Sequence, residues 1–328
     1  MKSPVLSSFS SSRLVTFFFC VLITATIAVA QTIPGQPPPA IQPTKGSVLV
    51  FNYYASSTTI ADSTGQLVVN DTTMSITNTS STSTVNLHLF FVANGGSADM
   101  TMCLVPGLTQ PMKASEIDPL NSGYLIVVAT DLNGVPINFN NLTGQTALSI
   151  NSGLTTGYPA QVIEALSGTP AVASGYNSTL NFDGVSYGKL PRAVGVNPVL
   201  KPGGMNQNFV VINRLAGNLN SQIGPLGSLD WLLTNNTNSR NSTANTLGGT
   251  QLQAILSDFS PPGLFTTLKG KQTGNLRVWT TNDLAVSGIF IRFRDVGGVK
   301  TLDGAGNLNT VTVTDSAKLT IPVFQIGC

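Results

Sequence analysis

The sequence predicts an all-β protein, an antiparallel β-sandwich of one large or two packed domains with a short helix. Apolar residues recur with a period of two in many short segments, and turn residues separate these segments about every 8 to 12 positions. Charged residues make up only 9% of the chain. Serine, threonine and asparagine therefore carry much of the polarity, and their side chains suit strands and turns.

The first 30 residues are predicted to be a signal peptide. Lys2 and Arg13 give a positive start, an apolar run follows from Leu14 to Ala30, and its end, "AVA", has the small residues of a cleavage site. A membrane anchor is the alternative, but the run is at the lower limit for spanning and leads into a proline-rich segment. We expect a secreted, periplasmic or cell-surface protein with no membrane span after cleavage.

Charge after cleavage argues against a nucleic-acid partner. The chain has 16 basic and 14 acidic residues, and loss of Lys2 and Arg13 leaves 16 − 2 = 14 of each sign. A neutral chain lacks the basic field that holds phosphate backbones or anionic lipid.

Residues 31–44 are predicted to be a proline-rich linker, with a β domain over 45–200. The period-two segments of this domain are "GSVLVFNYYA", "GQLVVNDTTMSITNT" and "TVNLHLFFVA". In the third segment, the odd positions from Val85 to Phe91 are apolar and form one face. His88, the single histidine, falls on the opposite face with Asn86, so we expect it to be structural or exposed to solvent.

Two further elements are predicted in this first domain. Residues 122–140 are expected to form a strand, a turn at Asp131, Asn133 and Gly134, and a second strand. Residues 158–168, "YPAQVIEALSG", favour a short helix that ends at a glycine.

Residues 201–328 are predicted to form a second β domain or a continuation of the same sandwich, because "KPGGMNQ" (201–207) is either a boundary or a long loop. Alternation in "SGIFIRFRD" gives one buried and one wetter face. The other strand-like segments are "QNFVVINRLAGNL", "GSLDWLLTN", "NLRVWTTNDLAV", "NTVTVTD" and "KLTIPVFQIG".

Several phrases resemble those of a group of secreted, β-rich bacterial proteins of unknown function, over roughly residues 45–235. The resemblance implies export and β structure, and no activity or site residue. The phrases are "SITNTSSTSTVNLHLFFV", "CLVPGLTQPMKASEIDP", "GYLIVVATDLNGVPINFN" and "NFVVINRLAGNL".

The sequence has no recognisable catalytic constellation, and we expect no catalytic residues. His88 is the single candidate for the base of a nucleophilic hydrolase, and no G-x-S-x-G motif accompanies it. The paired Asp-Thr-Gly motifs of aspartic proteases are absent. A glycosidase would need two carboxylates across a cleft, and the chain has only Glu116 and Glu164 besides its aspartates.

No metal or cofactor site is expected either. Zinc would have to use Cys103, His88 and Cys328, which is a poor ligand set. The oxygen-rich loops 130–134 and 302–307 are interpreted as turns, because neither has the spacing of an EF-hand. No phosphate-binding loop is present.

The leading functional hypothesis is a non-enzymatic exported protein with a structural, cell-envelope or adhesive role. The alternative is an extracellular module that binds carbohydrate or another small ligand, and the third is a hydrolase of an unrecognised type. Partners would be cell-surface components or extracellular glycans. Aromatic rings that could stack on sugars are Trp231, Trp279, Tyr53, Tyr54, Tyr124 and Tyr158.

The cysteines left after cleavage, Cys103 and Cys328, are predicted to form a disulfide, because export leads to an oxidising compartment. The alternative is that the terminal cysteine links to another molecule.

Overall fold

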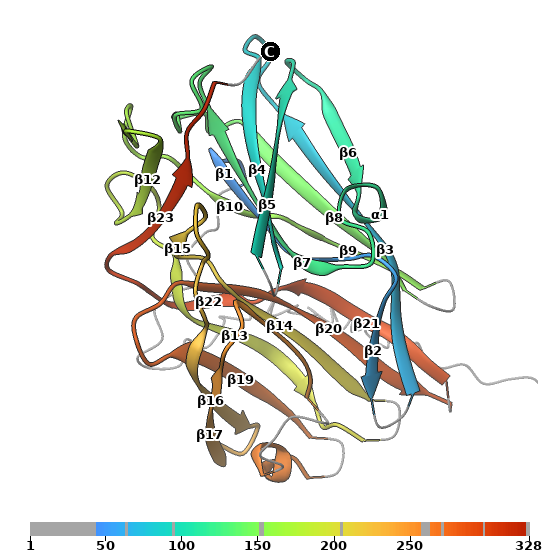
Figure 1. The fold of residues 1–328 in the computed structure, drawn as a ribbon. Helices are drawn as coiled ribbons and strands as arrows, with labels where there is room; N and C mark the ends of the chain where they lie inside the picture. The colour runs from blue at the N-terminus through green and yellow to red at the C-terminus, as the bar shows by residue number, and fades with distance from the viewer. Residues whose placement is uncertain are drawn as a thin grey trace, which may run out of the picture. The chain divides into compact units, whose positions relative to one another are not determined.

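The computed structural model describes residues 44–62, 65–93, 96–150, 154–203, 206–256, 263–269, 272–297 and 299–325 (Figure 1). The predicted signal peptide, the linker up to residue 43 and Cys328 lie outside the described residues. For residues 59–62, 65–68, 295, 299 and 300 only the backbone is described.

The all-β prediction is confirmed, since strands dominate the described chain. The two helical elements in this part of the chain are a short α-helix, α1 (Ala114–Ile117), and a 3₁₀ turn, η2 (Leu264–Thr267). The predicted helix over 158–168 is wrong: its residues end one strand and form another, in which Ile163 pairs with Val48. With so short a segment, the spacing of its apolar residues fits either a helix or a strand.

The predicted β-sandwich is also wrong. The strands of the described residues form five small sheets, arranged as a five-bladed β-propeller. The described residues belong to one compact unit. Each sheet is named below by one of its strands.

The β1 sheet has the strand order β10-β1-β7-β4-β5, all antiparallel. Its strands are β1 (Val48–Ala55), β4 (Val85–Ala93), β5 (Gly96–Leu104), β7 (Ser122–Thr130) and β10 (Gln161–Ile163). The predicted second strand within 135–140 is absent from it; there, Pro136 makes an isolated bridge to Thr130.

The β3 sheet has the order β2-β3-β8-β9, and β6 also pairs with β3. Its strands are β2 (Thr58–Asp62), β3 (Gly65–Asn78), β6 (Thr109–Lys113), β8 (Leu142–Ile150) and β9 (Leu154–Pro159).

The β12 sheet has the order β11-β12-β23-β15, and β15 runs parallel to β23. Its strands are β11 (Ala173–Ser174), β12 (Asn177–Phe182), β15 (Gly217–Asn218) and β23 (Ala317–Pro322). The last strand, β23, lies beside β12 although the two are far apart in the sequence (Figure 1).

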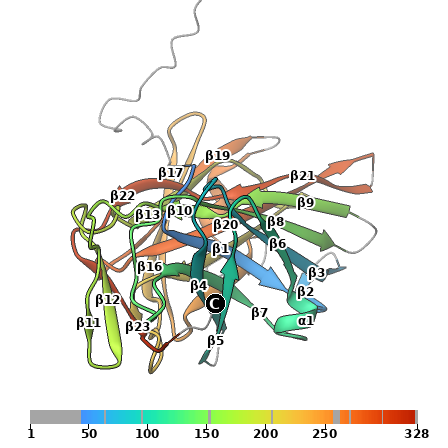
Figure 2. The ribbon, with the colours of Figure 1, turned by 90° about the horizontal axis from the view of Figure 1, so that it is seen from above.

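The β14 sheet has the order β18-β14-β20-β21. Its strands are β14 (Gln207–Arg214), β18 (Gln251–Ile255), β20 (Val286–Val296) and β21 (Val299–Asn307). Strand β21 also lies beside β9 of the β3 sheet (Figure 2).

The β16 sheet has the order β17-β16-β19-β13-β22. Its strands are β13 (Pro191–Leu200), β16 (Gly227–Asn235), β17 (Arg240–Leu247), β19 (Thr273–Thr280) and β22 (Asn309–Val313).

The β1 sheet is buried on both faces, and this burial explains why the sandwich prediction failed. One face, with Val50 and Phe90, packs on Ile321 of the β12 sheet. The other face, with Phe51, packs on Ile76 of the β3 sheet. A two-layer sandwich gives each sheet one inner face, so it does not accommodate a sheet covered twice.

Two more apolar clusters complete the core. Ile212 of the β14 sheet packs with Trp231 of the β16 sheet, and Leu148 of the β3 sheet packs with Phe209 of the β14 sheet. Four interfaces between neighbouring sheets are therefore filled by separate clusters, rather than by one continuous core.

A chain of buried amide side chains links the first and second halves of the chain. Asn213 Nδ2 donates to the backbone oxygen of Asn52 at 2.6 Å, and Gln251 Nε2 donates to Asn213 Oδ1 at 2.7 Å. Asn52 Nδ2 in turn donates to Asn307 Oδ1 at 2.9 Å. Asn52, Asn213 and Gln251 are buried. A buried amide without a hydrogen bond would destabilise the fold, so these bonds stabilise it.

Candidate binding surfaces

His88 was expected to be structural or exposed to solvent; it is buried, with 0% of its surface exposed, so the second alternative is wrong. Its Nε2 lies 2.7 Å from Asp99 Oδ2 on the neighbouring strand β5. Its ring lies against the ring of Phe90, with centroids 4.0 Å apart and an angle of 37° between the ring planes. The alternating pattern placed His88 on the correct face, but the β12 sheet and the residues after β23 cover that face.

The surroundings of His88 suit a structural residue rather than a catalytic base. Burial lowers its pKa, and the hydrogen bond and charge of Asp99 oppose that shift. Within the described part of the chain, Nδ1 has no hydrogen-bonding partner. The nucleophile–base–orienter geometry of a hydrolase is therefore not formed around this ring.

Five of the six aromatic residues considered for sugar stacking are buried and form no exposed platform. Their rings lie in the apolar clusters, and burial raises the pKa of the four tyrosines. These five are Trp231, Tyr53, Tyr54, Tyr124 and Tyr158. Two of the buried rings form hydrogen bonds within the protein. Tyr124 Oη donates to the backbone oxygen of Arg214 at 2.5 Å, and Trp231 Nε1 donates to Asn245 Oδ1 at 2.7 Å.

Trp279, the sixth, is half-buried on the outer face of the β16 sheet. Burial alternates along β19, where Leu276 and Val278 face the core and Arg277 and Trp279 face away from it. The 3₁₀ turn η2 contributes Leu264 to the same core and so lies on the inner side.

The residues directly opposite Trp279 on the two neighbouring strands are polar or small. Asp230 of β16 stands opposite Trp279, and Ala244 of the edge strand β17 stands opposite Asp230. On the other side, β13 places Ala193 opposite Trp279. An aromatic ring beside a carboxylate, with small residues around them, could contact both the apolar face and the hydroxyls of a sugar.

Tyr176 is an exposed aromatic residue that the sequence analysis did not name. It is 87% exposed at the turn between β11 and β12. Its backbone oxygen accepts a hydrogen bond from Val323 N at 2.8 Å. Tyr176 follows a glycine between two short strands, which is a signal for an exposed turn.

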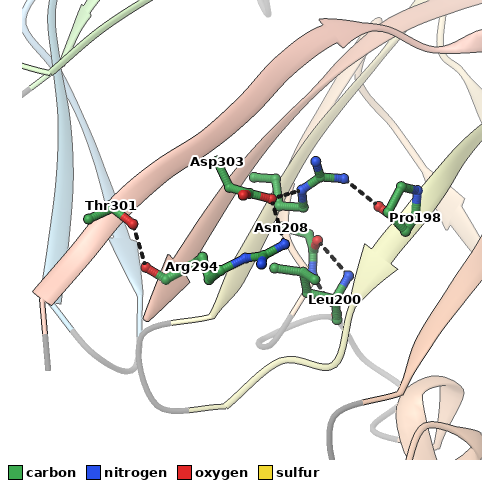
Figure 3. Close-up of polar contacts among 7 residues, drawn as sticks. Pro198, Leu200, Asn208, Arg294, Thr301 and Asp303 are labelled. Atoms are coloured by element: carbon green, nitrogen blue, oxygen red, sulfur yellow. Dashed lines mark hydrogen bonds and ion pairs between the residues drawn. The ribbon is translucent and has the colours of Figure 1, made fainter. Parts of the chain in front are cut away.

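A cluster of two arginines and one aspartate lies on the β20–β21 ribbon (Figure 3). Arg292 Nε lies 2.5 Å and Arg294 Nη2 3.2 Å from the same oxygen, Asp303 Oδ2. Arg292 Nη1 also donates to the backbone oxygen of Pro198 at 2.8 Å. The three side chains are 15%, 50% and 22% exposed for Arg292, Arg294 and Asp303.

The two predicted oxygen-rich turns have different outcomes. Asp131 forms a turn, in which its Oδ1 accepts bonds from the backbone N–H of Asn133 and of Val135, each at 2.9 Å. Residues 302–307 belong to strand β21, so the turn prediction there is wrong. Among the residues that the structure describes, no three His, Cys, Asp or Glu side chains come together as a metal site.

The remaining predicted site residues are dispersed. Glu116 lies exposed on α1, 3.8 Å from Lys113 Nζ, and Glu164 follows β10. Cys103 is half-buried on β5, with Sγ 3.4 Å from Asn86 Oδ1. Its pairing with Cys328 stays a prediction, because residue 328 lies outside the described part of the chain.

Comparisons with known proteins give no name to these surfaces. No protein-family model and no curated protein matches the sequence. A solved structure described as an anti-sigma factor domain-containing protein aligns over 82% of this chain and 99% of its own, with 8% identity and a TM-score of 0.11. A TM-score this low supports no inference about fold or function.

Within the described residues, no helix has the length and apolar character needed to cross a membrane.

Proposed function

We propose that this chain is an exported, non-enzymatic protein of the cell surface with an adhesive role, and that it binds neutral carbohydrate on the outer face of the β16 sheet. The observation that carries the proposal is the position of Trp279. Of the six rings considered for stacking, it alone lies outside the buried set.

The register of the strands supports this site. Asp230, directly opposite Trp279, offers carboxylate oxygens to sugar hydroxyls, and Arg277 is two residues from Trp279 on the same face. Residues opposite each other on one face of a sheet have Cβ atoms about 5 Å apart, which is close enough for one sugar ring to touch both. Ala193 and Ala244 extend the row without adding bulk or charge.

The non-enzymatic part of the proposal is supported by the state of His88. The single histidine is buried and hydrogen-bonded to the Asp99 carboxylate. This environment does not suit a general base that activates a nucleophile. The leader sequence supports export.

A glycan array followed by titration calorimetry tests the binding site. We expect the purified protein to bind at least one neutral oligosaccharide and Trp279→Ala to weaken that binding about tenfold or more, the equivalent of about 1.4 kcal/mol. Tyr176→Ala removes an exposed aromatic ring elsewhere and should leave the affinity unchanged. Failure to bind any neutral glycan, or equal binding by Trp279→Ala, would refute the site.

Intrinsic fluorescence gives a second readout. The chain has two tryptophans, of which Trp231 is buried. A saturating glycan should therefore change the emission of the wild type, and this change should disappear in Trp279→Phe. Release of new reducing ends from any glycan that binds would contradict the non-enzymatic assignment.

A further inference from the structure

The arginine–aspartate cluster carries more positive charge than its partner neutralises. Two guanidinium groups share one oxygen of one carboxylate, so Arg292, Arg294 and Asp303 together have a net charge of +1. The guanidinium of Arg292 is anchored by the backbone oxygen of Pro198 and lies 5.9 Å from the centre of the Phe290 ring. A fixed guanidinium loses little freedom when it binds a further acceptor.

Hydrogen-bonding capacity in the cluster remains unused. Arg294 is half exposed, and a guanidinium has five N–H donors, of which one is directed to Asp303. In the described part of the chain, both arginines contact Asp303 through Oδ2, and Asp303 Oδ1 has no hydrogen-bonding partner. The cluster therefore presents free cationic donors next to a free anionic acceptor.

The backbone opposite leaves room for a ligand. Gly304 pairs with Arg292 across the ribbon, and a Cβ at Gly304 would lie 3.6 Å from Arg292 Nη2. With glycine there, no side chain covers that nitrogen from the neighbouring strand. Thr301 Oγ1 donates to the backbone oxygen of Arg294 at 3.1 Å and holds the ribbon together beside the cluster (Figure 3).

We propose that Arg294, with Arg292 and Asp303, binds the uronic acid units of an acidic polysaccharide. The ligand carboxylate accepts hydrogen bonds from the free N–H groups of Arg294, in the planar geometry that guanidinium and carboxylate share. A neighbouring ring hydroxyl donates to Asp303 Oδ1. A sugar acid carries both groups, whereas a simple anion supplies only the first.

This site is separate from the proposed Trp279 surface and goes beyond it. Trp279 lies on β19 of the β16 sheet, and the arginine cluster lies on β20 and β21 of the β14 sheet. The two proposals can consequently fail independently.

The test uses an oligogalacturonide and its fully methyl-esterified form, in which an uncharged methyl ester replaces each carboxylate. By titration calorimetry at low salt, we expect the acidic oligomer to bind and the esterified one to bind at least tenfold more weakly. Arg294→Gln should reduce the affinity for the acidic oligomer by about tenfold. Arg240→Gln is the matched control, because Arg240 is also an exposed arginine, on strand β17.

Four outcomes would overturn the proposal. They are no binding of the acidic oligomer at millimolar concentration, equal binding of the esterified form, equal losses in the Arg294 and Arg240 variants, and equal binding of a sulfated neutral glycan. Thermal unfolding checks that each variant is folded. Arg294→Lys is a second variant. It keeps the positive charge but lacks the planar guanidinium, so its affinity for the acidic oligomer should lie between those of the wild type and Arg294→Gln. Trp279→Ala should leave this binding unchanged.

Discussion

The ring of Phe324 meets the ring of His88 edge to face, with centroids 4.8 Å apart and an interplanar angle of 74°. Phe324 follows the last strand, and its backbone also packs on Gly134, where a Cβ would lie 2.5 Å from the Phe324 oxygen. Val323 N donates to the backbone oxygen of Tyr176 at 2.8 Å. The segment after β23 is therefore held over the covered face of the β1 sheet.

This arrangement supports the predicted disulfide between Cys103 and Cys328. Cys103 stands opposite Asn86, two residues before His88 on β4, and Phe324 already contacts His88. Three residues lie between Phe324 and Cys328 in the sequence, and an extended chain covers about 3.3 Å per residue. We expect non-reducing peptide mapping of the mature protein to give a linked Cys103–Cys328 peptide.

The bond would close a loop of more than 200 residues, for which the chain-entropy model gives at most about 5 kcal/mol. Reduction should lower the unfolding temperature accordingly. A covalent dimer that dissociates under reducing conditions would instead support the intermolecular alternative.

His88→Ala is expected to destabilise the protein by about 3 kcal/mol. The substitution removes a buried ring that packs on Phe90 and Phe324, and it takes away the partner of Asp99. Urea unfolding measures the loss. Thr101→Ala, at the position opposite His88 on β5, is the control and should cost much less, because Thr101 is half-buried. A loss below about 0.5 kcal/mol would show that the ring is exposed in solution.

The pKa of His88 should lie below its ordinary value of about 6.5, because burial outweighs the effect of Asp99. The unfolded chain then takes up the proton at a higher pH than the folded chain does. Stability is therefore fully present above about pH 6.5 and falls as the pH drops toward the lower folded pKa.

NMR titration of the imidazole measures this directly, and the assignment is unambiguous since the chain has one histidine. A pKa above 6.5 would mean that Asp99 dominates. In that case stability would fall as the pH rises.

Asn213→Ala should cost about 3 kcal/mol. The variant loses the bond to the Asn52 oxygen and leaves Gln251 without its acceptor, and unsatisfied buried groups cost about 1–3 kcal/mol each. Denaturant unfolding gives the value. The exposed Asn220 offers a control, whose replacement by alanine should change the stability by about 0.5 kcal/mol or less.

The sequence predicted strands where local alternation identifies them. Strand β16 has the predicted bounds, 227–235, and the odd positions from Val85 to Phe91 do share one buried face. The burial of His88 depends on the β12 sheet and on Phe324, which lie far later in the sequence, and no local period can indicate such contacts. The same limit applies to the number of sheets, since alternation does not tell which strands pair.

The candidate sites were predicted only in part. Trp279 was named with five rings that turned out to be buried, because the alternation around each aromatic residue does not tell which face is covered. The alternation in "SGIFIRFRD" predicted that Arg292 and Arg294 lie on the more solvent-exposed face of their strand. Its convergence on Asp303 depends on the pairing of β20 with β21, which includes an irregularity between Arg292 and Phe293.

The pairing of β12 with β23 has a consequence for the timing of folding. Thr179 and Thr320 meet across these strands, 141 positions apart, and their hydroxyl oxygens are 3.0 Å apart. Pairings of such high contact order close slowly, and a strand cannot pair before it is synthesised. One cover of the β1 sheet is thus missing until the segment that holds β23 has been synthesised. A nascent chain whose β1 sheet still lacks this cover is incompletely packed, a state that would suit the proposed export.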